Sequence, residues 1–274
     1  MFLAHTSANQ ADQLAAAVVG AMRPPSGWCS QFQPHFLSLI FRELLEVEID
    51  FQRIPGLSVA EASVIFPDPL QRRELIELLV LTEMMVNPIP VELERSLEHW
   101  ADALNVHDRS LVLARDVAIQ ARAQAQSDFY RLFWMGEEDL QKANFELLLE
   151  KHGTQAWTFT VEEDPELAAQ WRSLAQLPGG TLGAAVWQHY QSHSFTTPGE
   201  LGGANAALAH HDWLHVLGGY KVDVIGEVEN AAFGAGSSSV PGSTLWFLGA
   251  MAMFEGGLFD SVVAGCQPHQ ISAA

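Results

Sequence analysis

The sequence is poor in basic residues and in cysteine, and its apolar runs are interrupted by acidic side chains. Only 14 Lys and Arg stand against 33 Asp and Glu, which gives a formal net charge of −19 at pH 7. Such a surface repels the phosphates of nucleic acids and of anionic lipid headgroups. Nucleic acid is therefore excluded as an expected partner, whereas an apolar groove for a neutral lipid tail stays compatible with this charge.

The two cysteines, Cys29 and Cys266, are far apart in the sequence, and neither belongs to a CxxC pair. A disulfide framework or a cysteine-rich zinc site is therefore not expected, and a reducing cytoplasm suits the chain. The first 22 residues contain a short apolar run but no Lys or Arg, so they lack the charged region of a secretory signal. We expect a cytoplasmic protein.

One segment, 245–263, approaches the length and apolar character of a membrane span. Glu255, Asp260 and three glycines interrupt it, and a charged side chain at bilayer depth costs a few kcal/mol. We therefore expect a buried or groove-lining helix, with Glu255 either a neutral core carboxyl or a group directed at a site. Peripheral contact with a membrane remains compatible with this reading.

The pattern of apolar residues predicts an all-α chain of two helical domains, 1–150 and 151–274. Residues 73–86 are apolar almost all round, as in the central helix of a bundle, and the sequence VNPIP ends this helix. Residues 91–106 carry apolar side chains at helical spacing on one side only. Asp108 is placed to begin a third helix, which runs toward an aromatic cluster at 129–134.

Residues 60–140 resemble the helical TerB-like fold, named for tellurite-resistance proteins. The resemblance lies in the order of an apolar helix, a short break, and a helix that starts with acidic residues and ends in WADALNV. The acidic metal-binding loop of that family has no counterpart here, because VNPIP supplies no carboxylate. The resemblance implies a structural or interaction module that recruits a protein partner.

Beyond a linker or short extended piece at 151–163, turn signals mark two helices of the second domain. Asp164 and Pro165 form a helix start, and Gly179 and Gly180 supply its stop. Thr181 is placed to cap the next helix.

Three polar side chains share one side of the helix predicted at 204–217. His211, Asp212 and His215 fall within an arc of about 100°, and histidines at i and i+4 can meet one cation. Glu227, from a further helix that opens near Asp223, can add a second carboxylate. This donor set suits Zn²⁺ and also Mn²⁺ or Fe²⁺. The alternative is a buried hydrogen-bonded network without a metal.

The segment HDWLHVLGGYKVDVIGE has the form HDxxH, eleven residues, then E. It resembles the metal-ligand motif of the coenzyme Q (ubiquinone) biosynthesis family, and LPGGTLGAAVWQHY, 177–190, is similar to a segment that precedes the motif in that family. The resemblance, which covers about 165–235, implies an all-α fold in which His211, Asp212, His215 and Glu227 bind a divalent metal, usually zinc. It also implies decarboxylation and hydroxylation of ring carbon 1 of a quinone precursor, in contact with membranes and isoprenoid tails.

These implications make the chain a candidate metal-dependent lyase or oxidative decarboxylase whose four ligands are also its catalytic residues. Two alternatives stay open. The first is a hydrolase in which HDxxH replaces HExxH and Asp212 acts as general base. The second is a non-catalytic lipid-binding or scaffolding protein with a structural metal. The expected partners are an apolar small molecule or isoprenoid lipid, a protein bound by the N-terminal domain, and a second copy of the chain.

Overall fold

The chain is helical throughout its described part. The computed structural model describes residues 3–86, 88–107, 147–148, 150–157, 159–205, 208–237, 243–255, 257 and 271. Within these residues the only β-type pairing is an isolated bridge between Phe159 and Ala204. The prediction of an all-α fold is confirmed.

The chain divides into two compact units. The first unit is Met1–Phe129 with Thr244–Ser261 and Gly265–Ala274, and the second is Tyr130–Ser243 with Val262–Ala264. A boundary at residue 150 stays a prediction, because 108–146 lie outside the described residues. The predicted helix after Asp108 and the aromatic cluster at 129–134 lie outside them as well.

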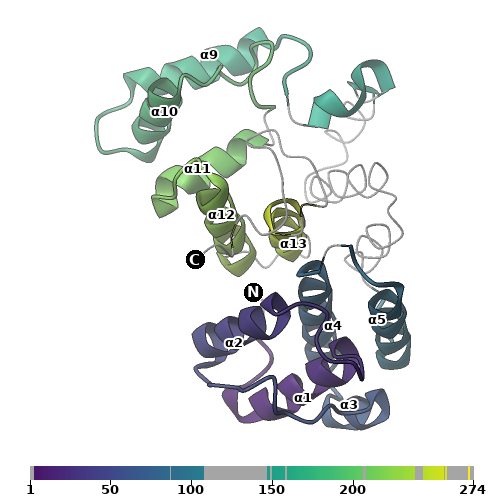
Figure 1. The fold of residues 1–274 in the computed structure, drawn as a ribbon. Helices are drawn as coiled ribbons and strands as arrows, with labels where there is room; N and C mark the ends of the chain where they lie inside the picture. The colour runs from purple at the N-terminus through teal and green to yellow at the C-terminus, as the bar shows by residue number, and fades with distance from the viewer. Residues whose placement is uncertain are drawn as a thin grey trace. The chain divides into compact units, whose positions relative to one another are not determined.

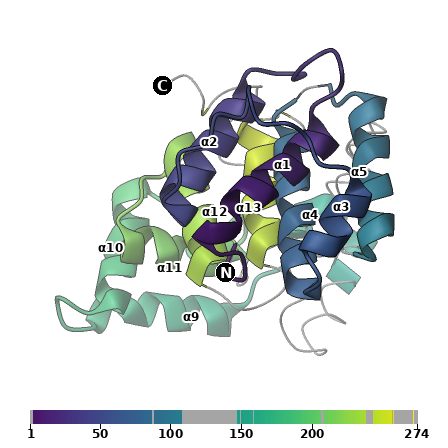
Figure 2. The same ribbon diagram turned by 90° about the horizontal axis from the view of Figure 1, so that it is seen from below.

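Helix α4 (Pro69–Met84) is the central helix of the first unit. Every residue from Glu74 to Met84 is buried, which confirms the helix predicted from its all-round apolar pattern. Its start is capped by Asp68, whose Oδ1 accepts a hydrogen bond from the backbone N–H of Leu70 at 2.9 Å. Helix α4 packs against three others, and Figures 1 and 2 show them around it: α1 (Ala11–Met22), α2 (Phe32–Leu45) and α5 (Val91–Leu104).

The remaining helices of this unit follow the expected amphipathic rules. Helix α5 buries Leu93, Leu97, Trp100 and Leu104, as its spacing predicts. Helix α3 (Val59–Ile65) packs on α1 and α5 and begins with a capping box between Ser58 and Glu61. Helix α13 (Ser243–Phe254) belongs to this unit from Thr244 onward, and the adjacent Glu255 is buried.

A buried carboxylate of the first unit, Glu83, has no hydrogen-bond partner among the described residues. The side chain of Glu83, on α4, is 1% exposed, and neither of its oxygens has a hydrogen-bond partner in the described structure. Burial first, and the charge of Glu94 second, raise the pKa of Glu83 to about 8. Glu83 is therefore mostly a neutral acid at pH 7.

The second unit places three helices side by side in chain order, and Figure 1 shows the sequence α10, α11, α12. Helix α10 packs on α11 and on the short helix η3, and α11 packs on α12. Its elements are η2 (Gly153–Trp157), α9 (Pro165–Ser173), η3 (Leu174–Gln176), α10 (Leu182–His193), α11 (Leu208–Gly218) and α12 (Val224–Ser237).

Two helix starts in the second unit agree with the prediction from the sequence, whereas one helix end does not. Asp164 accepts a hydrogen bond from the N–H of Leu167 at 3.0 Å, and Thr181 accepts one from Ala184 at 3.3 Å, so both predicted caps are confirmed. Helix α9 ends at Ser173, before the predicted stop at Gly179 and Gly180, because the chain tightens into η3.

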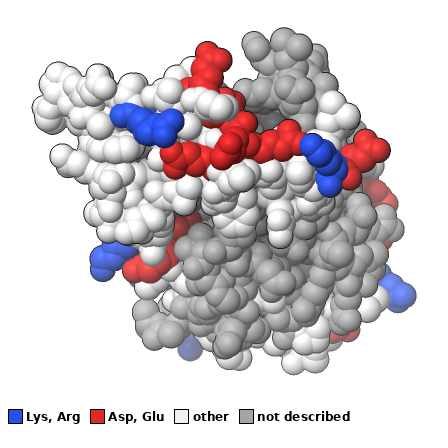
Figure 3. Space-filling view, turned by 90° about the horizontal axis from the view of Figure 1, so that it is seen from above, with Lys and Arg blue, Asp and Glu red and all other residues white. Residues whose placement is uncertain are grey.

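None of the described helices combines the length and the apolar character that a membrane crossing requires. Figure 3 shows the face on which α9 lies in Figure 1, where Asp and Glu side chains form a band with few basic neighbours. Exposed acidic residues surround the start of α9, at Glu162, Glu163, Asp164 and Glu166. This face is unfavourable for a polyanion.

Candidate metal centre

The helix predicted at 204–217 includes Ala204 and Asn205, which lie before α11 in the structure. Ala204 is held in the bridge to Phe159, and the next residue, Asn205, caps the helix. Its Oδ1 accepts a hydrogen bond from the N–H of Leu208 at 2.8 Å, while its Nδ2 donates to the carbonyl of Ala156 at 3.0 Å. The later start leaves the predicted arc of polar side chains within the helix.

A close turn returns the chain from α11 to α12. Gly219 adopts a left-handed backbone with φ of 72°, and the N–H of Tyr220 donates to the carbonyl of His215 at 3.0 Å. A Cβ on Gly226 would lie 1.9 Å from the carbonyl oxygen of Lys221, so only glycine permits this approach. Asp223 accepts a hydrogen bond from the N–H of Gly226 at 2.9 Å, and α12 begins at Val224, which confirms the predicted helix start near Asp223. The turn thereby brings Glu227 to α11.

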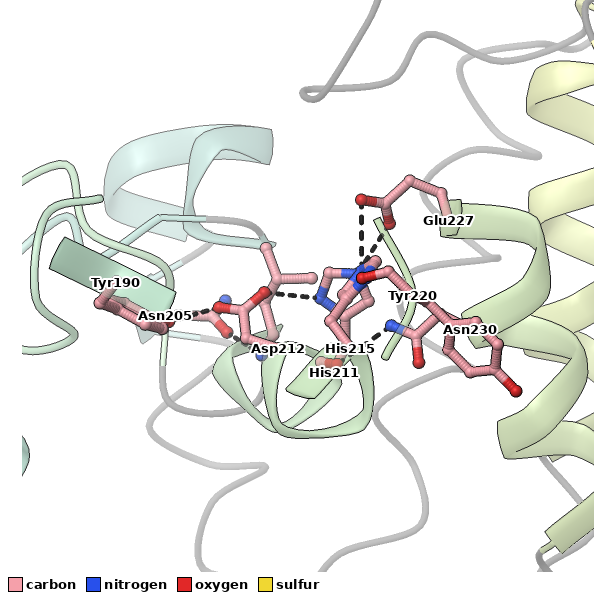
Figure 4. A network of polar contacts seen from close by, with 9 residues as sticks. Tyr190, Asn205, His211, Asp212, His215, Tyr220, Glu227 and Asn230 are labelled. Carbon is pink, nitrogen blue, oxygen red and sulfur yellow. Dashed lines mark hydrogen bonds and ion pairs between the residues drawn. The ribbon is translucent and has the colours of Figure 1, made fainter. Parts of the chain in front are cut away.

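Three side chains converge at this junction, as Figure 4 shows. Nε2 of His211 lies 2.7 Å from Oε2 of Glu227 and 3.1 Å from Nε2 of His215. Nε2 of His215 lies 3.4 Å from the second oxygen, Oε1, of Glu227. Each residue offers a ligand atom within 4.8 Å of the others, and this is the one such group among the described residues.

The outer nitrogens of both imidazoles are fixed. Nδ1 of His215 lies 3.4 Å from the carbonyl oxygen of Tyr220, and Nδ1 of His211 lies 3.1 Å from Oδ1 of Asp212. Because carbonyl and carboxylate oxygens accept hydrogen bonds, these two contacts favour the tautomer with the proton on Nδ1 of each ring. The Nε2 atoms are thereby left to face the common point, which is the usual arrangement of metal-binding histidines.

Asp212 does not join the converging group. Its Oδ2 accepts a hydrogen bond from the hydroxyl of Tyr190, and its Oδ1 faces Nδ1 of His211, on the outer side of the ring. The sequence places Asp212 in the same arc as the histidines, but one residue advances 100° around a helix, and the neighbour available in that direction is Tyr190 on α10. Asp212 is therefore placed to orient a ligand.

Electrostatics of the cluster favour a positive charge at its centre. Burial lowers the pKa of His211, but hydrogen bonds and charges of Asp212 and Glu227 outweigh it and raise this pKa above the ordinary value. Burial raises the pKa of Glu227, and its contacts with His211 and His215 reverse the shift and lower it. Without a metal, a proton on Nε2 of His211 holds the three groups together.

The same geometry fits a divalent cation. A tetrahedral Zn²⁺ with Zn–N bonds of about 2.0–2.1 Å places two ligand atoms about 3.3 Å apart. The two Nε2 atoms are 3.1 Å apart, and one oxygen of Glu227, Oε1, is buried with no hydrogen-bond partner in the described structure. His211, His215 and Glu227 can therefore hold a metal ion in the place of the bridging proton.

Sequence reasoning found the three converging residues and missed their supports. Asn230 is 0% exposed and donates from Nδ2 to the carbonyl of His211 at 3.0 Å, which ties α12 to α11. Tyr190 lies 22 positions before Asp212, and no rule of helical spacing predicts a contact between residues so far apart in sequence. His210 and Glu229, a histidine and a carboxylate close to the cluster in sequence, are exposed and lie outside it.

The segment 245–263, predicted as a buried or groove-lining helix, belongs to the first unit as far as it is described, and a groove along it stays a prediction. Comparisons with protein-family models, curated proteins and solved structures find no match to this chain. The class that the fold and the site define is thus a helical protein with a His–His–Glu cluster that can bind a metal.

Proposed function

We propose that the second unit binds one divalent cation, most suitably Zn²⁺, through His211, His215 and Glu227. The observation that carries this proposal is the convergence of two Nε2 atoms and a carboxylate from two helices, each imidazole held by its outer nitrogen. Two buried imidazoles with both Nε2 atoms directed at one point repel each other unless a proton or a metal cation lies between them. Mn²⁺ and Fe²⁺ accept the same donors.

A site with three protein ligands favours chemistry over a purely structural metal. Structural zinc sites use four protein ligands, whereas catalytic ones use three and keep a position for water or substrate. Among the described residues the cluster supplies three, and Asp212 contacts Tyr190 and His211 instead. The scaffold alternative therefore ranks below a site that binds a reactant.

The contacts of Asp212 also argue against the hydrolase alternative. A general base in an HExxH-type site must reach a water beside the metal. Both oxygens of Asp212 lie on the outer side of His211, one of them bound to a buried tyrosine. This carboxylate is not placed to accept a proton at the centre of the cluster.

The reactant that we propose is a quinone-like aromatic ring bearing an isoprenoid tail, acted on at ring carbon 1. The support is the HDxxH motif with its glutamate twelve positions after the second histidine, together with the preceding LPGGTLG segment. A bound cation supplies a Lewis acid for a ring oxygen or carboxylate, which stabilises negative charge as CO₂ leaves. His211, His215 and Glu227 hold that cation, and Asp212 orients His211.

The metal is tested by equilibrium dialysis of Zn²⁺ against the purified full chain and three variants. We expect one Zn²⁺ per chain, and a loss of affinity of roughly 100-fold or more in His215→Ala and Glu227→Gln, because zinc binding of about 10 kcal/mol is shared among few ligands. The matched control is His210→Ala, which removes an exposed histidine of the same helix and is expected to bind as the unmodified chain does. Full Zn²⁺ content in Glu227→Gln would contradict the site.

The substrate class is tested separately. Native mass spectrometry of the metal-loaded chain, mixed with a bacterial lipid extract, is expected to show a bound prenylated aromatic compound. Glu227→Gln is expected to lose it if the metal contacts the ring and to keep it if only the tail is bound. Recovery of short water-soluble ligands alone would reject the quinone assignment and leave the metal site standing.

A further inference from the structure

Tyr190 on α10 is a buried polar residue that packs closely against aromatic neighbours beside the cluster. Its side chain is 1% exposed, and its ring lies 4.9 Å from that of Trp171 and 5.6 Å from that of Phe195, the latter edge-on at 87°. Two aromatic neighbours leave the ring little freedom to turn away. Its hydroxyl is therefore fixed in space by packing on α9 and on the chain that follows α10.

That hydroxyl begins a line of polar contacts that ends at the metal-binding atom. It donates to Oδ2 of Asp212, and the other oxygen, Oδ1, lies 3.1 Å from Nδ1 of His211, as Figure 4 shows. The opposite nitrogen, Nε2 of His211, faces Glu227 and His215. Three helices, α10, α11 and α12, thus meet through one continuous set of contacts.

We propose that Tyr190 is a positioning residue of the metal site, which it reaches through Asp212. This inference rests on the proposed metal binding and adds to it a role for Asp212 as the carboxylate that orients His211 rather than as a ligand. Tyr190 fixes that carboxylate so that it accepts the Nδ1 proton of His211. The ring is then held in the tautomer and the orientation that present Nε2 to the cation.

The role follows from the rotational freedom that Asp212 would otherwise have. A carboxylate on a helix surface can rotate about two bonds, and an oxygen left without its donor in a buried position is unfavourable. With the tyrosine hydroxyl in place, a single carboxylate orientation satisfies both Tyr190 and His211. Removing outer partners of metal-bound histidines costs about 10–100-fold in metal affinity.

The experiment is a Co²⁺ titration of the full chain, followed by visible absorption, with competition by Zn²⁺. Tyr190→Phe keeps the packed ring and removes only the hydroxyl, and we expect its affinity to fall about 10-fold or more. The Co²⁺ bands are expected to shift as well, because the orientation of His211 changes. The control is His210→Ala, which removes an exposed side chain of α11 outside the cluster and is expected to leave both readouts unchanged.

A double-mutant cycle separates positioning from a general structural effect. If Tyr190 acts through Asp212, Tyr190→Phe added to Asp212→Asn lowers affinity by less than 2-fold beyond Asp212→Asn alone. If the loss of metal affinity in the double variant equals the product of the losses in the two single variants, the inference is overturned. So would a Tyr190→Phe chain that is unfolded without metal, or one with unchanged affinity and spectrum. An unmodified chain that binds no Co²⁺ or Zn²⁺ would overturn the proposed metal site, and the inference with it.

Discussion

Two buried glutamates, Glu83 in the first unit and Glu227 in the second, respond to burial in opposite ways. Their side chains are among the least exposed acids in the described structure. Burial and Glu94 raise the pKa of Glu83 to about 8, whereas contacts with two histidines overcome burial at Glu227 and lower its pKa. The comparison shows that partners, and not depth, decide whether a buried carboxylate is charged.

The same difference in partners distinguishes Glu83, a residue of the core, from Glu227, a residue of the candidate metal centre. Glu83 lies on a helix buried on all sides, and its oxygens have no hydrogen-bond partner among the described residues. Glu227 lies in the first turn of α12 and contacts two imidazoles across a helix junction. A neutral acid offers little to a cation, whereas an anion beside two nitrogens is a ready ligand.

The largest expected effects are opposite changes in stability when each glutamate becomes leucine. In metal-free protein, Glu227→Leu leaves the buried, charged His211 without one of its two carboxylate partners and is expected to lower the free energy of unfolding by roughly 3 kcal/mol. Glu83→Leu removes an unsatisfied buried group and is expected to raise it by about 1–3 kcal/mol. Hydrogen exchange of peptides from α12 and α4 locates each change, and the same sign at both positions would contradict the comparison.

The next effect is a dependence of stability on pH that belongs to Glu83. The folded chain holds this proton up to about pH 8, while the unfolded chain releases it near the ordinary value of 4.5. Between these values the native state binds the extra proton, so its stability falls as pH rises, by up to about 1.4 kcal/mol per unit, and is level outside the window. Urea unfolding of the unmodified chain and of Glu83→Leu at pH 5, 6, 7 and 8 isolates the difference. A difference that does not change with pH would show that Glu83 titrates normally.

The smallest effect distinguishes the two causes of the raised pKa of Glu83. Glu94→Gln removes the neighbouring charge and is expected to lower that pKa, but by less than burial raises it, because Glu94 is the second cause. The carboxyl carbon signal of Glu83, followed by NMR against pH, measures this directly. A return of the pKa to its ordinary value in Glu94→Gln would make charge the dominant cause.

The sequence was informative where the cause of structure is local. The apolar pattern of 73–86 and the acids before α9 and α12 predicted helices that the structure contains. The start of α11 was misplaced, because Ala204 pairs with Phe159, 45 positions earlier. Helix α9 ends earlier than predicted because the chain passes into η3, a local change that the positions of the glycines do not reveal.

By itself the sequence determined that two histidines, one turn apart, would project from one side of a helix and that a glutamate would return to meet them. Helical periodicity and a glycine turn suffice for this, since both act over a few residues. Only the tertiary structure decided that Asp212 turns outward to Tyr190 while Glu227 closes the cluster. The reason is that a side chain takes the partner that packing brings within reach, and helix α10 arrives there through contacts that no sequence spacing encodes.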